Sequence, residues 1–182
     1  MRYWNQDAET LPREQLREVQ SERLQAKVAY VYERVPFYRQ RFDEAGVRPS
    51  EVKDLEDLRR LPFTRKSDLR DNYPSGLFAL PLEECLRLHA SSGTRGKPTI
   101  VGYSRADLAQ WSEVCARALV SVGGQPGDVL QNAYGYGLFT GGLGFHQGAE
   151  LVGMTVVPTS SGNTARQILM LQDLGARGLC CT

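Results

Sequence analysis

The pattern of apolar residues along the chain changes near residue 85. Before that point, apolar residues recur at helical spacing from Pro12 to Val35, which predicts one long amphipathic helix. Pro12 suits a first helical turn, and Pro36 ends the helix because the residue before a proline leaves the helical region. Shorter helices are predicted at 37–46, 50–61 and 64–73.

From residue 85 onward the pattern alternates between short apolar runs and amphipathic segments. The runs predict strands at 85–90, 98–103, 128–134, 154–158 and 178–181. Helices are predicted at 104–122, in the later part of 135–153, and at 163–174. Strands separated by amphipathic helices imply a mostly parallel sheet with flanking helices and right-handed crossovers. The predicted class is α/β, with a helical N-terminal region at 1–84 and an incomplete α/β subdomain at 85–182.

The helix at 104–122 has a recognisable beginning, face and end. Ser104 and Asp107 form a capping-box-like start, and the pair Gly123-Gly124 stops the helix. Its buried stripe is predicted to comprise Leu108, Trp111, Cys115, Ala118, Leu119 and Val122. The following helix at 163–174 is predicted to be capped by Asn163 and closed by Gly175.

The bulk composition excludes several classes of function. The 182 residues are 41% hydrophobic and 24% charged with a net charge of +1, so no excess of positive charge attracts nucleic acid or a membrane surface. No apolar run of about 18 residues is present to span a membrane. The cysteines lack metal-ligand spacing, and we interpret them as small buried apolar residues in a reducing cytoplasm. They are Cys85, Cys115, Cys180 and Cys181.

The segment "SSGTRGK" at 91–97 is a candidate phosphate loop. Pro98 and an apolar run follow Lys97, so no helix begins there and the segment is not a Walker loop. Its glycines let backbone N–H groups converge, and its hydroxyl and cationic side chains add donors. The alternative interpretation is a polar hairpin loop made of flexible residues.

Four blocks in chain order resemble one family. "LPFTRKSDLRDNYPSGLFA", "LHASSGTRGKPTIVGYSRADL", "QNAYGYGLFTGGLGFHQGAE" and "VVPTSSGNTARQ" are similar to the phenylacetate–coenzyme A ligases, which are adenylate-forming enzymes. The similarity covers essentially the whole chain. It implies the front part of the large domain of such an enzyme.

The resemblance implies a two-step reaction. ATP and an arylacetate would give an acyl adenylate and pyrophosphate, and coenzyme A would then displace AMP to form the thioester, with Mg²⁺ as cofactor. The residues implied in phosphate binding are Ser91, Ser92, Gly93, Thr94, Arg95, Gly96 and Lys97. The family usually has threonine in place of Arg95, so this cation either adds a phosphate contact, displaces the nucleotide or has no effect.

The glycine-rich block lies where the family shapes its pocket for the carboxylic acid. Tyr134, Tyr136 and Phe139 are the predicted aromatic walls, although core packing would equally explain each of them. We favour a packed role over a pocket role for His146, and Gln147 stands where the family often has tyrosine. No chemistry is assigned to His89 or to the "RKSDLRD" segment.

Several parts of the family's machinery have no counterpart in these 182 residues. They lack the Tyr-Gly-x-Ser/Thr-Glu segment, the hinge motif and the C-terminal lid with its catalytic lysine, so no catalytic residue is assigned here. We therefore expect a front portion of a cytoplasmic ligase, inactive alone. There are two alternatives. The chain could be a stand-alone nucleotide- or phosphate-binding module, or a piece that forms a homodimer through its helical arm at 12–35.

Overall fold

The computed structural model describes residues 2–91 and 97–181, and the chain forms two compact units. The described part of one unit comprises residues 2–9, 87–91 and 103–181, and that of the other comprises 10–86 and 97–102. The units alternate along the chain. The predicted domain boundary after residue 84 remains a prediction.

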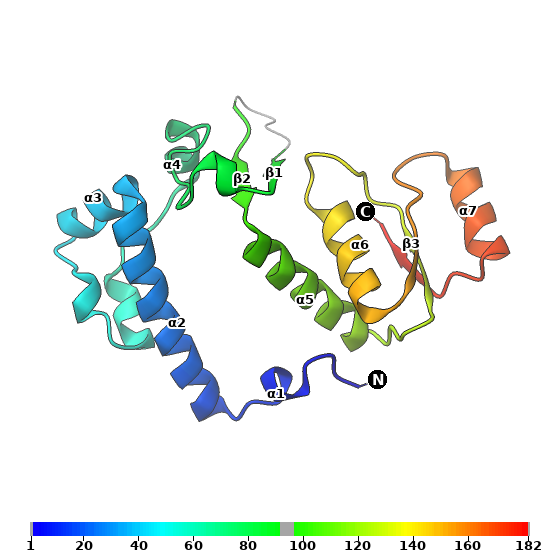
Figure 1. Ribbon diagram of the computed structural model, residues 1–182, viewed down its shortest axis with the longest axis horizontal. Coiled ribbons are helices and arrows are strands. Elements are labelled where there is room, and N and C mark those ends of the chain that lie inside the picture. Colours follow the sequence, from blue (N-terminus) through cyan, green and yellow to red (C-terminus); the bar gives the residue numbers. More distant parts are fainter. Residues whose placement is uncertain (1, 92–96, 182) are drawn as a thin grey trace. The chain divides into compact units, whose positions relative to one another are not determined.

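The helical unit is built around α2 (Arg13–Arg34) and α3 (Pro36–Glu44), shown in blue in Figure 1. The amide of Val35 still donates to the carbonyl of Val31, but Val35 itself is extended, and Pro36 begins α3. The predicted end of the long helix before Pro36 is confirmed, because α2 ends at Arg34. Pro36 is also well suited to the first position of the next helix. A small apolar cluster closes this unit, comprising Val28, Phe42, Val47 and Val52.

The helix predicted at 50–61 is wrong in type. Two short 3₁₀ helices, η1 (Pro49–Glu51) and η2 (Leu55–Arg60), occupy this stretch. Val52 between them is extended and buried in the apolar cluster, and the Asp54 side chain accepts from the amide of Glu56. Burial of Val52 and this local cap outweigh the helical pattern. The next helix, α4 (Lys66–Asp71), follows the prediction closely.

The remaining short elements of the N-terminal half are α1 (Gln6–Glu9) and the 3₁₀ turn η3 (Leu82–Glu84). Strands β1 (Arg87–Ala90) and β2 (Ile100–Tyr103) form a two-stranded sheet. Among the residues that the structure describes, no helix is both long and apolar enough to cross a membrane.

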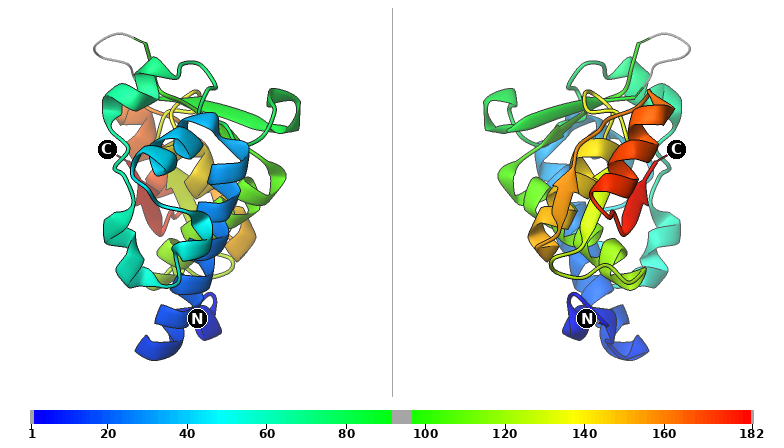
Figure 2. Two further views of the ribbon diagram at one scale, coloured as in Figure 1. Left: turned by 90° about the vertical axis from the view of Figure 1, so that its left-hand side faces the viewer. Right: turned by 90° about the vertical axis from the view of Figure 1, so that its right-hand side faces the viewer.

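A three-stranded parallel sheet organises the other unit. The strand order is β4 (Thr155–Val157), β3 (Val129–Asn132), β5 (Gly178–Cys180), with Leu130 between Val156 and Gly178. Helices α6 (Gly141–Val152) and α7 (Thr164–Asp173) lie on opposite sides of β3 in Figure 1. Figure 2 shows α7 in orange beside β5 in its right-hand view. The predicted α/β class and parallel sheet are confirmed.

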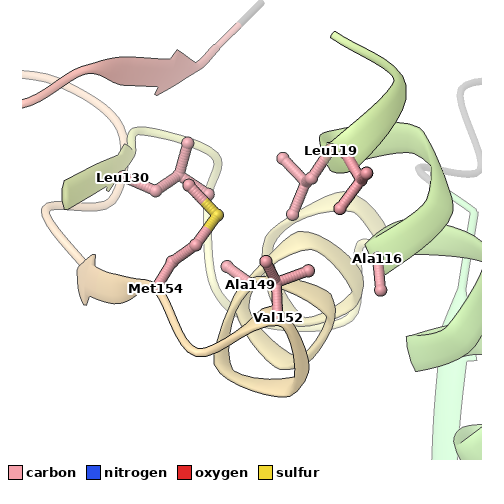
Figure 3. Packing of buried hydrophobic residues seen from close by; sticks show 7 residues of the cluster. Ala116, Leu119, Leu130, Ala149, Val152 and Met154 are labelled. Carbon is pink, nitrogen blue, oxygen red and sulfur yellow. The ribbon is translucent and has the colours of Figure 1, made fainter. Parts of the chain in front are cut away.

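The core of this unit lies where α5 (Arg105–Ser121) and α6 pack against the sheet. Side chains from both helices and from the sheet converge, as Figure 3 shows for Leu119, Ala149 and Leu130. The buried cluster comprises Ala116, Leu119, Val120, Leu130, Ala149, Val152 and Met154. Two glycines of α6 set the helix spacing. An ideal Cβ on Gly148 would stand 2.5 Å from the Cβ of Cys115, and one on Gly144 would stand 2.5 Å from the Nε1 of Trp111.

The predicted stripe of α5 is partly wrong. Ala118 and Val122 are exposed, the latter at 83% of its surface, whereas Ala116 and Val120 are buried. The buried face of α5 is rotated from the predicted one, because α6 packs against Cys115 and Ala116. Ser104 caps α5 as expected, since its Oγ accepts from the amide of Asp107.

The cysteines differ from one another in burial. Cys115 is buried and Cys180 half-buried, and burial raises the pKa of both thiols, so they stay neutral at neutral pH. Cys85 is half-buried. Cys181 is exposed because it follows the last residue of β5, so the expectation that all four are buried is wrong.

Replacing Gly148 with alanine tests the helix contact. The new methyl group meets the backbone of Cys115 and Ala116, and overpacking of this kind costs about 1–3 kcal/mol in the free energy of unfolding. Urea denaturation measures the change. Gly137→Ala is the control, because no described residue other than its chain neighbours has an atom within 4 Å of its Cβ position, and it should change stability by less than about 0.5 kcal/mol. Equal effects of the two variants would contradict the packing argument.

Asn163 offers a second test, because it combines a helix cap with a left-handed backbone. Its Oδ1 accepts from the amide of Arg166 at 3.1 Å, and its φ is +50°. Asn163→Ala loses the cap and keeps the strained φ, so we expect a loss of about 1 kcal/mol or more in urea denaturation. Asn163→Gly relieves the strain and should cost only a few tenths, roughly. A smaller loss of stability in Asn163→Ala than in Asn163→Gly would show that the cap does not stabilise α7.

Candidate active site

The predicted phosphate loop begins directly after β1, and only its two ends lie in the part of the chain that the structure describes. Ser91 follows the last residue of β1, and Lys97 precedes β2. The Nζ of Lys97 lies 5.0 Å from the centroid of the Tyr73 ring, a cation–π contact. The other predicted phosphate-binding residues lie outside the described residues, namely Ser92, Gly93, Thr94, Arg95 and Gly96.

One carbonyl attaches the glycine-rich loop to the strand that leads into the phosphate loop. The Leu138 oxygen accepts from the amide of Ala90 at 3.0 Å and from the Nδ1 of His89 at 2.9 Å. A carbonyl only accepts, so His89 carries its hydrogen on Nδ1. The segment 133–140 is therefore held at the end of β1.

His89 itself is a structural residue. Its side chain is 1% exposed, and the rings of Tyr103 and Trp111 meet it edge-on at centroid distances of 5.6 and 5.4 Å. Among the residues that the structure describes, none is a hydrogen-bond partner of its Nε2. Sequence reasoning left His89 without chemistry and did not find its contact with Leu138, which joins residues 49 positions apart.

The three aromatic residues predicted for the pocket do not form one wall. Tyr134 stacks on Phe145 with ring centroids 6.0 Å apart, and it meets Phe139 at 6.2 Å. Phe139 is 54% exposed. Tyr136 lies apart from this group and packs edge-on against His146, with centroids 5.7 Å apart. The loop thus offers two separate aromatic surfaces.

A buried asparagine that sequence reasoning missed holds the loop together. Asn132, the last residue of β3, is fully buried. Its Nδ2 donates to the Tyr136 hydroxyl at 2.8 Å and to the carbonyl of Gly142 at 2.7 Å, and its Oδ1 accepts from the amide of Tyr134. The available signal was a polar residue at the carboxyl end of a buried strand.

The Tyr136 hydroxyl continues into a chain of side chains along α6. It lies 3.1 Å from the Nδ1 of His146, and the Nε2 of His146 lies 3.2 Å from a carboxylate oxygen of Glu150. Partial burial is the main cause that raises the pKa of Tyr136, so the hydroxyl keeps its hydrogen at neutral pH. His146 is therefore packed, as favoured, and also hydrogen-bonded on both ring nitrogens.

Two further polar contacts shape the edges of the site. The side-chain oxygen of Gln147 accepts a hydrogen bond from Arg87 of β1 at 3.1 Å. Gln147 is the residue predicted to stand where the family often has tyrosine. Gln167 of α7 accepts from Gln131 of β3 and from Thr159, and its Nε2 donates to the carbonyl of Ser160. These bonds hold the loop after β4 at the carboxyl end of the sheet, where α/β proteins bind ligands.

Two hollows of the same unit lie elsewhere. One, of about 380 Å³, is a shallow polar depression lined by Trp4, Asn5, Gln6, Asp7 and Glu113. The other, of about 130 Å³, is lined by Leu119, Val122, Gly123, Gly124, Asp128, Leu130, Met154, Arg177 and Gly178. Neither is lined by Tyr134, Tyr136 or Phe139. The chemistry of the loops, rather than these hollows, defines the candidate site.

Comparison with known proteins agrees with the predicted resemblance. No protein-family model matches the chain. It is 62% identical over 176 residues to a phenylacetate–coenzyme A ligase of Thermus thermophilus, and 51% identical over 165 residues to that of Escherichia coli. These alignments cover 97% and 91% of this chain, but only 40% and 38% of the relatives.

Solved structures give the same result for the fold. The chain superposes on 2-hydroxyisobutyryl-CoA ligase, solved with 2-HIB-AMP and CoA, with a TM-score of 0.92 and 33% identity. The superposition covers 98% of this chain and 39% of that one. The chain thus spans about two fifths of the length of the proteins it matches, and over that span it is similar to the phenylacetate–coenzyme A ligases.

Proposed function

We propose that this chain is the portion of an ATP-dependent arylacetate–CoA ligase that binds ATP phosphates and part of the carboxylic acid. The observation that carries the proposal is 51–62% identity to four phenylacetate–coenzyme A ligases. The attachment of the glycine-rich loop to the end of β1 supports it, because Ser91, the first residue of the predicted phosphate loop, directly follows that strand.

The proposed reaction has two steps. An oxygen of the arylacetate carboxylate attacks the α-phosphorus of ATP, and the bond to the pyrophosphate oxygen breaks, which leaves an acyl adenylate. The thiol of coenzyme A then attacks the acyl carbon, loses its proton and releases AMP. The barrier of the first step falls when preorganised donors stabilise the charge that develops on pyrophosphate.

The residues at 91–97 are proposed to supply those donors. Backbone N–H groups at Gly93 and Gly96 would surround the β- and γ-phosphates, with hydroxyl groups from Ser91, Ser92 and Thr94. Lys97 and Arg95 would add charge. The adjoining glycine-rich loop would place Tyr134, Tyr136 and Phe139 near the aryl acid.

Mg²⁺ is proposed to enter with ATP. In nucleotide sites it is held largely by phosphates and water, with one or two carboxylates. Within residues 2–91 and 97–181, no group of three or more histidine, cysteine or acidic side chains is placed to hold a metal ion. We propose a cytoplasmic enzyme whose partners are arylacetate, ATP and CoA, with homodimer formation as a further proposal.

Transplantation tests the proposed function. The matching segment of the Thermus thermophilus ligase is replaced by this chain, and phenylacetate-dependent formation of AMP, pyrophosphate and phenylacetyl-CoA is measured. We expect a working chimera, because the segment would supply its binding loops, and no turnover from the 182-residue chain alone. A folded chimera without activity would contradict the ligase proposal. ATP binding by the isolated chain in calorimetry would then favour a stand-alone phosphate-binding module.

Lys97 provides the sharpest single-residue test in that chimera. Loss of a charge-assisted contact to phosphate should raise the KM for ATP about 10- to 100-fold in Lys97→Ala. Lys53→Ala, which removes an exposed lysine, is the control and should leave KM unchanged. Tyr73→Leu removes the ring beneath Lys97. If it matches Lys97→Ala in size, the lysine orients the loop instead of binding phosphate.

A further inference from the structure

With His146 neutral, the hydrogen bonds around Tyr136 have one consistent direction. The amide nitrogen of Asn132 can only donate, so the Tyr136 oxygen accepts from it. The Glu150 carboxylate only accepts, so the Nε2 of His146 carries the hydrogen in that contact. In the neutral imidazole the Nδ1 is then an acceptor, and the Tyr136 hydroxyl donates its single hydrogen to it.

We propose that His146 and Glu150 are positioning residues that fix the direction of the Tyr136 hydroxyl in the candidate pocket. The pocket role of Tyr136 rests on the proposed function. Glu150 selects the tautomer of His146, and His146 in turn receives the Tyr136 hydrogen. The oxygen of Tyr136 therefore presents a lone pair, not a hydrogen, to any group placed against it.

The arrangement of α6 favours this role over simple packing. His146 and Glu150 are four residues apart and so share one helix face, and their side chains are 25% and 61% exposed. If His146 only packed against the core, no carboxylate such as Glu150 would be needed on this exposed face of α6. The other titratable group that acts on Tyr136 is Cys180 of β5, and burial raises the pKa of its thiol, so it adds no charge at neutral pH.

The two histidines of the chain allow a direct spectroscopic test. His89 carries its hydrogen on Nδ1, which donates to Leu138, whereas His146 should carry it on Nε2. ¹⁵N NMR of the 182-residue chain at neutral pH should thus show two opposite tautomers. Glu150→Ala should mix the tautomers of His146, and Glu150→Gln, which keeps an acceptor, should restore the Nε2–H form. An Nδ1–H tautomer at His146 would overturn the proposal.

A double-mutant cycle in the chimera tests whether His146 acts through Tyr136. Tyr136→Phe and His146→Leu should each raise the KM for phenylacetate roughly 2- to 10-fold, the worth of one hydrogen bond. The double variant should be no worse than either single variant, because the second change removes a contact already lost. His146→Asn, whose Oδ1 can accept in place of Nδ1, should recover part of the loss.

Leu151→Ala is the matched control for the cycle, since Leu151 lies on the same helix with 46% of its surface exposed. Its effect should add to that of Tyr136→Phe. Additive effects of His146→Leu and Tyr136→Phe would overturn the proposal. If His146→Leu fails to fold, His146→Ala, which also lacks an acceptor, completes the cycle. An inactive chimera with the expected tautomers would reject the ligase function while the hydrogen-bond chain stands.

Discussion

The close contact of α5 and α6 is the constraint on which the site depends. Gly144 and Gly148 have no Cβ, so α6 approaches until its backbone meets Trp111 and Cys115 of α5. A methyl group at either position would push the helices apart. That spacing fixes how closely α6 lies against α5, and with it the position of His146 on α6.

Two polar groups then hold the loop between β3 and α6 in place. Asn132 binds both Tyr136 and the first turn of α6, while the Leu138 carbonyl receives hydrogens from Ala90 and His89. Buried polar groups of this kind specify one loop conformation, because an unsatisfied partner would cost about 1–3 kcal/mol. The loop is thus positioned from the sheet on one side and from β1 on the other.

Under the proposed function, the site would have to bring two substrates together. Adenylation requires the carboxylate and the α-phosphorus to be aligned, and misplacement of either lowers the rate steeply. The hydrogen bonds from Ala90 and His89 to Leu138 hold the glycine-rich loop at the end of β1, the strand that Ser91 follows. The chain of Asn132, Tyr136, His146 and Glu150 extends the same principle to the direction of a single hydroxyl.

Local patterns in the sequence determined much of the fold. Apolar periodicity, Pro36, the Ser104 cap and the Asn163 cap predicted elements that the structure contains, because each depends on neighbours a few residues away. The 50–61 segment was mispredicted because burial of Val52 is a tertiary effect. Resemblance in several blocks indicated the family before any geometry was known.

Only the tertiary structure decided how the candidate residues are grouped. Tyr134, Tyr136 and Phe139 share a loop in the sequence, yet Tyr136 belongs with His146 on α6 and the other two with Phe145. His89 and Leu138 are 49 residues apart, and no periodicity links them. Such contacts arise when packing brings distant backbone and side-chain groups together, so the sequence determined the elements and the packing of α5 on α6 decided the site.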